Sequence, residues 1–221
     1  MNISLEQPAH AAAIEQLLDT SFGPKRHTKT VYRLRRNIAP VADLCFVATE
    51  TDADGQEVLL GTIRYWPVML GGKVHALMLG PIAISPDRRS DGLGGKLIRH
   101  SLEQARALGH RIVILVGDAP YYVRFGFSRA VVAGLSLPGP VDPARFQGLE
   151  LVPGALDGVT GMVGRAAPAR TRTPALRTAS PAVRPAAKIT TLPLPAADPV
   201  SPNPVPLDLP VSRRRLRRAA R

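Results

Sequence analysis

The chain changes its hydrophobic period once near its middle, and this change constrains the fold more than any other feature. Residues 75–84 have the composition of a strand, whereas apolar residues recur at helical spacing from Gly92 to Leu108. Gly109 then ends the helical pattern, and residues 112–116 form an unbroken apolar run, typical of a strand buried on both faces. Strand, glycine-rich turn, helix and buried strand together predict a βαβ unit.

The segments on either side of this unit predict further strands and two helices. Glycine and Asp-Gly turns separate the strands before it, which indicates an antiparallel meander. We expect helices at residues 9–18 and 25–36 and strands at 43–49, 58–65, 75–84, 127–137 and 149–163, the last two around a turn at 138–143. The predicted fold class is therefore mixed α/β (α+β), with a largely antiparallel sheet, one parallel crossover and flanking helices.

Composition divides the chain at about residue 164. Of the 22 prolines, 11 fall between Pro168 and Pro210, and residues 165–221 carry twelve Lys or Arg against two Asp. We expect residues 1–164 to form one domain, followed by a disordered Pro-, Ala- and Arg-rich basic tail. Most of the net charge of +12 belongs to this tail. Contact with nucleic acid is therefore expected only through the tail, at the arginines of residues 213–218.

Cysteine usage and hydropathy exclude several classes of protein. Cys45 is the single cysteine, so no intrachain disulfide forms, and no cysteine-ligated metal site is expected. The N-terminus lacks the pattern of a signal peptide, and every apolar run is shorter than the roughly 20 residues that span a bilayer. We expect a cytoplasmic protein with no membrane contact and no metal; a homodimer is left open.

A phosphate-binding pattern lies at the turn of the βαβ unit. Residues 89–94 read Arg-Ser-Asp-Gly-Leu-Gly, an R-x-x-G-x-G motif between a strand and a helix. Glycines let a ligand approach the backbone, and free N–H groups at a helix start favour anions. A glycine-rich turn before an amphipathic helix would look the same, so the motif needs its context. No G-x-x-x-x-G-K-[ST] loop is present.

The ordered motifs resemble those of the GNAT superfamily of acetyl-CoA-dependent N-acetyltransferases. The series is Ile-Ala-Ile-Ser-Pro at 82–86, the R-x-x-G-x-G turn, a helix, a strand and Tyr-Tyr-Val-Arg-Phe-Gly-Phe at 121–127. The resemblance covers most of residues 1–164 and is closest to a bacterial subgroup. It implies a parallel strand pair splayed by a bulge to admit pantetheine. Gly80-Pro81 supports such a break, because proline cannot donate to a strand ladder.

The resemblance also implies which residues hold acetyl-CoA. Main-chain groups of the splayed strand should bond the pantetheine arm, and backbone N–H groups at the turn should hold the pyrophosphate, helped by an arginine. The implied residues are Ile82, Ala83 and Ile84 for the arm, and Arg89, Ser90, Asp91, Gly92, Leu93, Gly94 and Gly95 for the pyrophosphate. The side chains of Ile82 and Ile84 are equally expected in the core.

For the catalytic proton donor, the family's Y-x-x-x-G-F tyrosine corresponds to Tyr122, with Tyr121 as the alternative. A tyrosine is protonated at neutral pH and has one proton to donate; the competing interpretation is that both rings only pack. No base is assigned: Asp118 is weighed against a helix-capping role, and His75 against a surface hairpin position. Cys45 is considered as a nucleophile, but its strand position favours the core.

The acceptor amine leaves fewer signals. Basic residues near the predicted site would attract an acidic substrate or form the solvated face of a helix; they are Lys25, Arg26, Arg33, Arg35 and Arg36. Trp66 would line the acceptor pocket or lie in the core. The predicted function is transfer of an acetyl group from acetyl-CoA to a primary amine of a small molecule or protein by direct attack. The alternative is a non-catalytic acyl-CoA-binding sensor.

Overall fold

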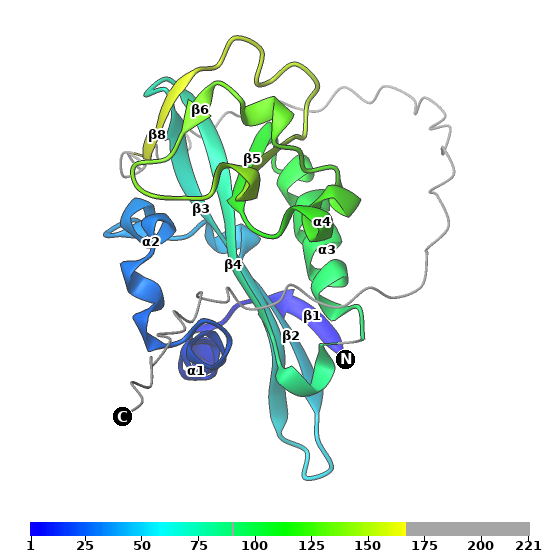
Figure 1. The fold of residues 1–221 in the computed structure, drawn as a ribbon. Helices are drawn as coiled ribbons and strands as arrows, with labels where there is room; N and C mark the ends of the chain where they lie inside the picture. Colours follow the sequence, from blue (N-terminus) through cyan, green and yellow to red (C-terminus); the bar gives the residue numbers. More distant parts are fainter. Residues whose placement is uncertain (90, 167–221) are drawn as a thin grey trace, which may run out of the picture.

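The computed structural model describes residues 1–89 and 91–166, and a sheet of eight strands forms their centre (Figure 1). The strand order is β1-β2-β3-β4-β5-β7, while β8 pairs with β3 and β6. The strands are β1 (Asn2–Leu5), β2 (Phe46–Thr51), β3 (Glu57–Leu70), β4 (Val74–Ile84), β5 (Ile112–Val116), β6 (Leu135–Ser136), β7 (Phe146–Glu150) and β8 (Gly161–Arg165). The pairs β4–β5 and β6–β8 are parallel and the others antiparallel, as the expected mixed sheet requires.

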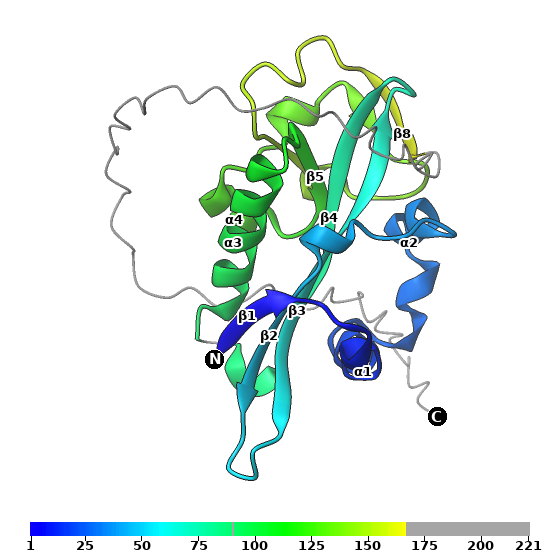
Figure 2. The ribbon, with the colours of Figure 1, turned by 180° about the vertical axis from the view of Figure 1, so that it is seen from behind.

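Helices cover both faces of this sheet. In Figures 1 and 2, α3 (Leu93–Ala107) and α4 (Ala119–Tyr122) lie on one side, and α1 (Ala11–Phe22) and α2 (Thr30–Arg35) on the other. Helix α3 buries the apolar stripe predicted from its period, including Leu97 and Ile98, in the larger core cluster. Helix α1 buries Ile14 and Leu18 against the opposite face of the sheet.

The parallel pair β4–β5 is short, and the two strands then separate. Their register contains only Leu77 opposite Val113 and Met78 opposite Ile114, although β4 continues to Ile84. Beyond this point β4 stays paired with β3, whose register shifts between Ile63 and Tyr65. The edge of β4 that faces β5 therefore has no strand partner past Met78 within the described part of the chain. This is the splay expected at Gly80-Pro81, where the peptide bond is cis.

Two predicted strands are wrong beyond β5. The expected strand at 127–137 contains a 3-10 turn, Ala130–Val132, and only β6 is extended. Arg129 closes this turn, because its Nη1 donates to the Val132 carbonyl at 2.6 Å. The expected strand at 149–163 is the end of β7 and the start of β8, separated by turns at Gly154 and Gly158, whose φ values are 76° and 67°. Both glycines were a turn signal that the apolar pattern obscured.

The N-terminal half holds one strand that was not expected. Strand β1 pairs with β2 at the edge of the sheet, and β3 runs through Pro67 to Leu70 instead of ending at residue 65. The domain boundary placed at 164 stays a prediction; β8 itself ends at Arg165. The basic tail, apart from Arg165 and Ala166, lies outside the described residues.

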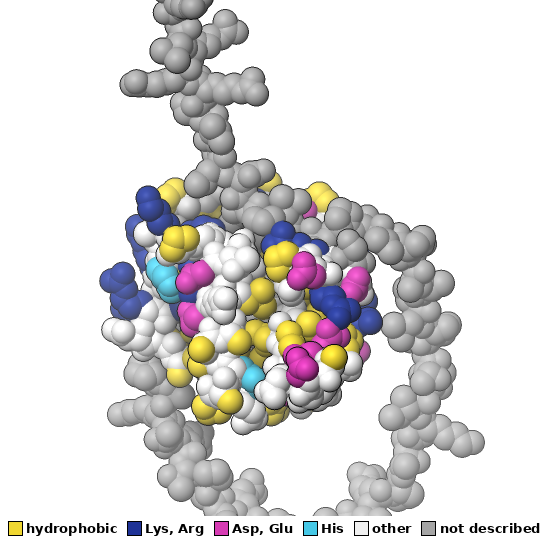
Figure 3. Space-filling view, turned by 90° about the horizontal axis from the view of Figure 1, so that it is seen from below, with side chains coloured by type: hydrophobic (Ala, Val, Ile, Leu, Met, Phe, Trp, Pro, Cys, Tyr) yellow, Lys and Arg dark blue, Asp and Glu magenta, His cyan; other side chains and the backbone are white. Residues whose placement is uncertain are grey.

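The surface of the described residues carries mixed charge. Figure 3 shows acidic and basic side chains on both sides of a band of hydrophobic atoms, on the end of the molecule that bears the β2–β3 turn. No helix within residues 1–89 and 91–166 is both long and apolar enough to cross a membrane. In the same residues, no cluster of three or more His, Cys, Asp or Glu side chains has a metal-binding arrangement.

Candidate functional site

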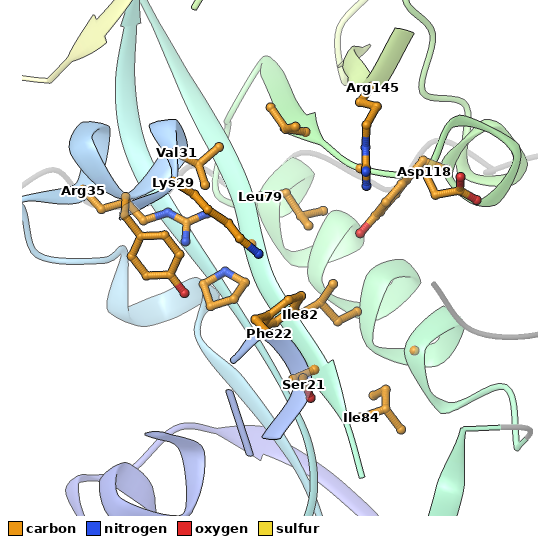
Figure 4. Close-up of a pocket in the computed structure, with 18 of the residues that line it drawn as sticks. Ser21, Phe22, Lys29, Val31, Arg35, Leu79, Ile82, Ile84, Asp118 and Arg145 are labelled. Atoms are coloured by element: carbon orange, nitrogen blue, oxygen red, sulfur yellow. The ribbon is translucent and has the colours of Figure 1, made fainter. Parts of the chain in front are cut away.

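A solvent-open cavity lies where β4 and β5 separate (Figure 4). One wall comes from the end of α1, from α2 and from the segment between them. The opposite wall comes from β5, α4 and Arg145, and β4 runs between the two. The residues from β4 and the following turn are Leu79, Gly80, Pro81, Ile82, Ala83, Ile84 and Arg89.

The structure brings five of the ten predicted acetyl-CoA residues to this cavity. Ile82, Ala83 and Ile84 line it on the edge of β4 that has no strand partner, and Arg89 and Gly94 line it beyond the end of the strand. Main-chain groups on an unpaired strand edge are available to an extended ligand. The geometry therefore suits a pantetheine arm along β4.

The start of α3 has the form of an anion site. Gly92 is its N-cap residue, adopts a left-handed conformation with φ of 67° and makes no side-chain cap to the helix. The first N–H groups of an α-helix have no intrahelical partner, so an anion is a suitable acceptor for them. Leu93 and Gly95 are buried, whereas Asp91 is exposed. Ser90 lies outside the described residues.

The two candidate tyrosines occupy different environments. Tyr122 lines the cavity and is 5% exposed, and burial raises the pKa of its hydroxyl. Tyr121 does not line it: the Arg124 guanidinium stacks 4.6 Å from the ring centre, and the hydroxyl has no hydrogen-bond partner in the described structure. Geometry thus favours Tyr122 as the group that reaches a bound substrate.

Of the candidate bases and the candidate nucleophile, only Asp118 lines the cavity. Asp118 lines the cavity and is exposed; it occupies the N-cap of α4 without a side-chain cap, so the capping interpretation is wrong. His75 lies outside the cavity, exposed at the start of β4. Cys45 is 3% exposed, its Sγ donates to the Val41 carbonyl at 3.3 Å, and burial raises its pKa to about 11.

The basic residues do not share one environment. Lys25, Arg33 and Arg36 are exposed, as the solvated-helix interpretation requires. Arg26 is buried, pairs with Glu15 and donates from Nε to Asp19 at 2.7 Å, and Arg35 is buried against the cavity, so that interpretation is wrong for both.

Trp66 belongs to the core. Its side chain is 9% exposed, its Nε1 donates to the Ile38 carbonyl at 3.1 Å, and it does not line the cavity.

The sequence did not single out several residues of the α1–α2 wall and the opposite wall. These are Ser21, Phe22, Lys29, Val31, Tyr32 and Arg145. The basic run around Lys29 was a signal for one of them. Arg145 stands in an ordinary Pro-Ala-Arg turn and only the fold brings it to the site.

Comparison with known proteins agrees with this geometry. The family model of the acetyltransferase (GNAT) family matches residues 11–127. The N-acetyltransferase YhbS of Escherichia coli K12 is 32% identical over 164 residues, which cover 74% of this chain and 95% of YhbS.

Two crystal structures share the fold. The structure of E. coli YhbS in complex with CoA has a TM-score of 0.63 and 31% identity, covering 75% of this chain and 89% of that one. A GNAT family acetyltransferase from Brucella melitensis in complex with acetyl-CoA has a TM-score of 0.55 and 35% identity, covering 75% and 96%. The chain belongs to the GNAT family of acetyltransferases.

Proposed function

We propose that the protein is an acetyl-CoA-dependent N-acetyltransferase that acetylates a primary amine by direct nucleophilic attack. The observation that carries the proposal is one cavity that joins an unpaired edge of β4, the uncapped start of α3 and the side chain of Tyr122. The complexes of YhbS with CoA and of the Brucella enzyme with acetyl-CoA support the same donor.

The donor would be held mainly by the backbone. Main-chain groups of Ile82, Ala83 and Ile84 would bond the pantetheine arm. Backbone N–H groups at residues 90–95 would receive the pyrophosphate, and the Arg89 guanidinium would add a positive charge. Both groups of residues reach the cavity: Ile84 lines it from the strand, and Arg89 and Gly94 line it from the turn.

The chemistry would then take one step at the thioester. A neutral amine nitrogen forms a bond to the carbonyl carbon, the carbon–sulfur bond breaks, and the departing thiolate takes the proton of Tyr122. The new amide nitrogen gives its extra proton to solvent, from which Tyr122 is reprotonated; we assign no protein base. Burial raises the pKa of Tyr122, so its hydroxyl is protonated at neutral pH.

A covalent acetyl-cysteine route is not supported. Thiol nucleophiles act as thiolates, whereas burial raises the pKa of Cys45 to about 11. The residue also lies outside the set that lines the cavity.

A non-catalytic acyl-CoA sensor is the second candidate. The observation that favours it is the shortage of candidate general bases. Among the described residues lining the cavity, only Asp118 has a carboxylate, and this residue is exposed. A binder and an enzyme would share the acetyl-CoA site, so only turnover separates them.

The test uses the full chain. Acetyl-CoA is titrated by calorimetry, and CoA thiol release is followed with a panel of primary amines.

Gly94→Glu places a carboxylate in the anion site and should weaken acetyl-CoA binding at least about a hundredfold, because like charges repel in a confined site. Gln104→Glu, which adds the same charge at an exposed position of α3, is the matched control. Thiol release that depends on an amine supports the enzyme. Binding without amine-dependent release supports the sensor, and absent binding by folded protein overturns both.

A further inference from the structure

Arg35 is a buried cation with no ion-pair partner among the residues that the structure describes. Its side chain is 9% exposed, and its Nε has no hydrogen-bond partner in the described structure. The guanidinium carbon lies 4.7 Å from the ring centre of Trp66 and 5.0 Å from that of Tyr32, so aromatic faces hold the cation. Burial lowers its pKa to about 10, and the side chain still carries its charge at neutral pH.

The acidic residues of the neighbouring segments are already engaged. Glu15 pairs with both Arg26 and Arg64, and the Nε and Nη2 of Arg64 each donate to Glu6 at 2.7 Å. Within residues 1–89 and 91–166, Arg35 has no salt bridge; Arg26 and Arg64 act on it only by repulsion, which lowers its pKa further. A buried charge left without a partner destabilises the folded state, so this site suits an anion from outside the chain.

Besides Arg89 at the predicted pyrophosphate turn, two further cations line the same cavity, Lys29 and Arg145. The pKa of Lys29 is lowered, first by burial and then by the positive charge of Arg145. Arg145 also lines the cavity, and its Nε is buried without a partner in the part of the chain that the structure describes. Asp118 supplies the only carboxylate of the described lining, so the walls beside β4 carry a positive excess.

This positive excess lies away from the proposed pyrophosphate site. The Nη2 of Arg35 is 3.4 Å from the position that a Cβ on Gly80 would take, so the guanidinium lies beside the start of the splay. Figure 4 shows Arg35 and Lys29 together on the α2 side of the cavity and Ile84, next to the α3 start, toward its other end. The anion for Arg35 is therefore distinct from the phosphates of acetyl-CoA.

From these contacts we infer that the acceptor is a small amine that also carries a carboxylate, as an amino acid does. Arg35 binds the carboxylate and is assisted by Lys29. The amine of the same molecule then points along β4 toward Tyr122. The inference rests on the proposed acetyl transfer. A free amino acid presents its amine and its carboxylate on one carbon, so a single small molecule can reach both Arg35 and the edge of β4, which line the same cavity.

A direct test measures anion binding without turnover. The melting temperature of the full chain is recorded with propionate and with propionamide, which has the same shape but no charge, in the presence of CoA. We expect propionate alone to raise it. Arg35→Met keeps the apolar stem against Trp66 and should remove the propionate shift; Arg33→Met, an exposed arginine of the same helix, should keep it.

Arg35→Lys retains one charge but loses the bidentate fork and should give a smaller shift. The inference is overturned if propionate and propionamide act alike on the wild type, or if Arg35→Met responds as the wild type does. A purely structural Arg35 would change the melting temperature but not its dependence on propionate.

A kinetic test uses amino acids and their decarboxylated amines. Leucine is compared with isoamylamine, and phenylalanine with 2-phenylethylamine, by CoA thiol release. We expect kcat/KM to favour the carboxylated member roughly tenfold to a hundredfold, the range for a charged hydrogen-bonded contact. Arg35→Met should abolish that preference by raising the KM for the carboxylated member of each pair. Equal rates within each pair, or preference for an acidic peptide over both amino acids, would contradict a small carboxylated acceptor.

Calorimetry of acetyl-CoA in the same samples distinguishes failure of the carboxylate site from failure of the acetyl-CoA site. If acetyl-CoA binds and propionate does not, only the acceptor inference fails. If acetyl-CoA does not bind folded protein, the proposed function fails first.

Discussion

The ring of Tyr122 occupies the space that a side chain at Gly117 would need. A Cβ built on Gly117 would lie 2.2 Å from Cε2 and 2.7 Å from Cδ2 of that ring. Gly117 follows β5 directly, and both residues line the cavity. The absence of a side chain at the end of β5 therefore lets the tyrosine approach the splay, and the position of Tyr122 depends on a residue with no functional group.

Gly117→Ala should displace Tyr122 and reduce turnover. Because the contact is with the body of a buried ring, the ring must move, at a cost of about 1–3 kcal/mol in unfolding free energy. A displacement near 1 Å at a catalytic group costs about a hundredfold in rate. We expect kcat to fall by about that factor with little change in acetyl-CoA affinity, measured by thiol release and calorimetry.

Gly164→Ala is the matched control, because a Cβ on Gly164 meets nothing within 4 Å. It should leave kcat unchanged. If the two variants lose activity equally, the link between Gly117 and Tyr122 is wrong.

Tyr122→Phe removes the proposed proton donor but keeps the ring that packs beside Phe127. We expect kcat to fall about a hundredfold or more, the usual contribution of general acid catalysis, while acetyl-CoA still binds. Tyr121→Phe, on a ring outside the cavity, should change kcat much less. The opposite ranking of the two variants would move the assignment to Tyr121.

The pH dependence of kcat follows from the pKa of Tyr122. Burial raises this pKa above the ordinary tyrosine value near 10, and an acid acts only while it is protonated. Rising pH therefore does not remove the donor in the working range, and kcat should not decline between about pH 7 and 10. A declining limb near neutral pH, present in wild type and lost in Tyr122→Phe, would contradict the raised pKa. Melting curves at each pH exclude unfolding as a cause.

Cys45→Ala should keep turnover within about twofold, because a thiol with a pKa of about 11 is uncharged at pH 8 and is not the nucleophile. For the same reason iodoacetamide should not label Cys45 in the folded protein, whereas unfolding in guanidinium should expose it to labelling. Mass spectrometry reads out both states. An acetylated Cys45 after incubation with acetyl-CoA alone would restore the covalent route.

The βαβ unit was predictable because its signals are local. The helical stripe of α3 and the apolar run of β5 each arise from a contiguous stretch, and the glycines at Gly92 and Gly94 mark the turn before the helix. Gly80-Pro81 likewise indicated the break in β4 from sequence alone. The elements that were missed have weak local patterns: β1 has four residues with no buried side chain, and β6 has two residues.

The α1–α2 wall of the cavity and Arg145 depend on long-range packing that the sequence does not display. Arg35 stands in a run of basic residues that is typical of a solvated helix face. Its burial depends on Trp66, which is distant in the sequence and reaches α2 only because β3 continues past its predicted end. Arg145 similarly reaches the cavity from the turn before β7. Neither contact leaves a periodic signal.

The split of the cavity walls has an evolutionary consequence. The α1–α2 wall that carries Lys29 and Arg35 is built from a stretch of chain separate from the α3 start and β5, and the two meet mainly through β4. Changes at the partly buried Lys29, Val31 and Tyr32 would alter this wall, whereas Ile82, Ala83 and Ile84 are held by their pairing with β3. A gene with this arrangement can diverge toward new amines by drift in one short segment while inheriting its donor chemistry intact.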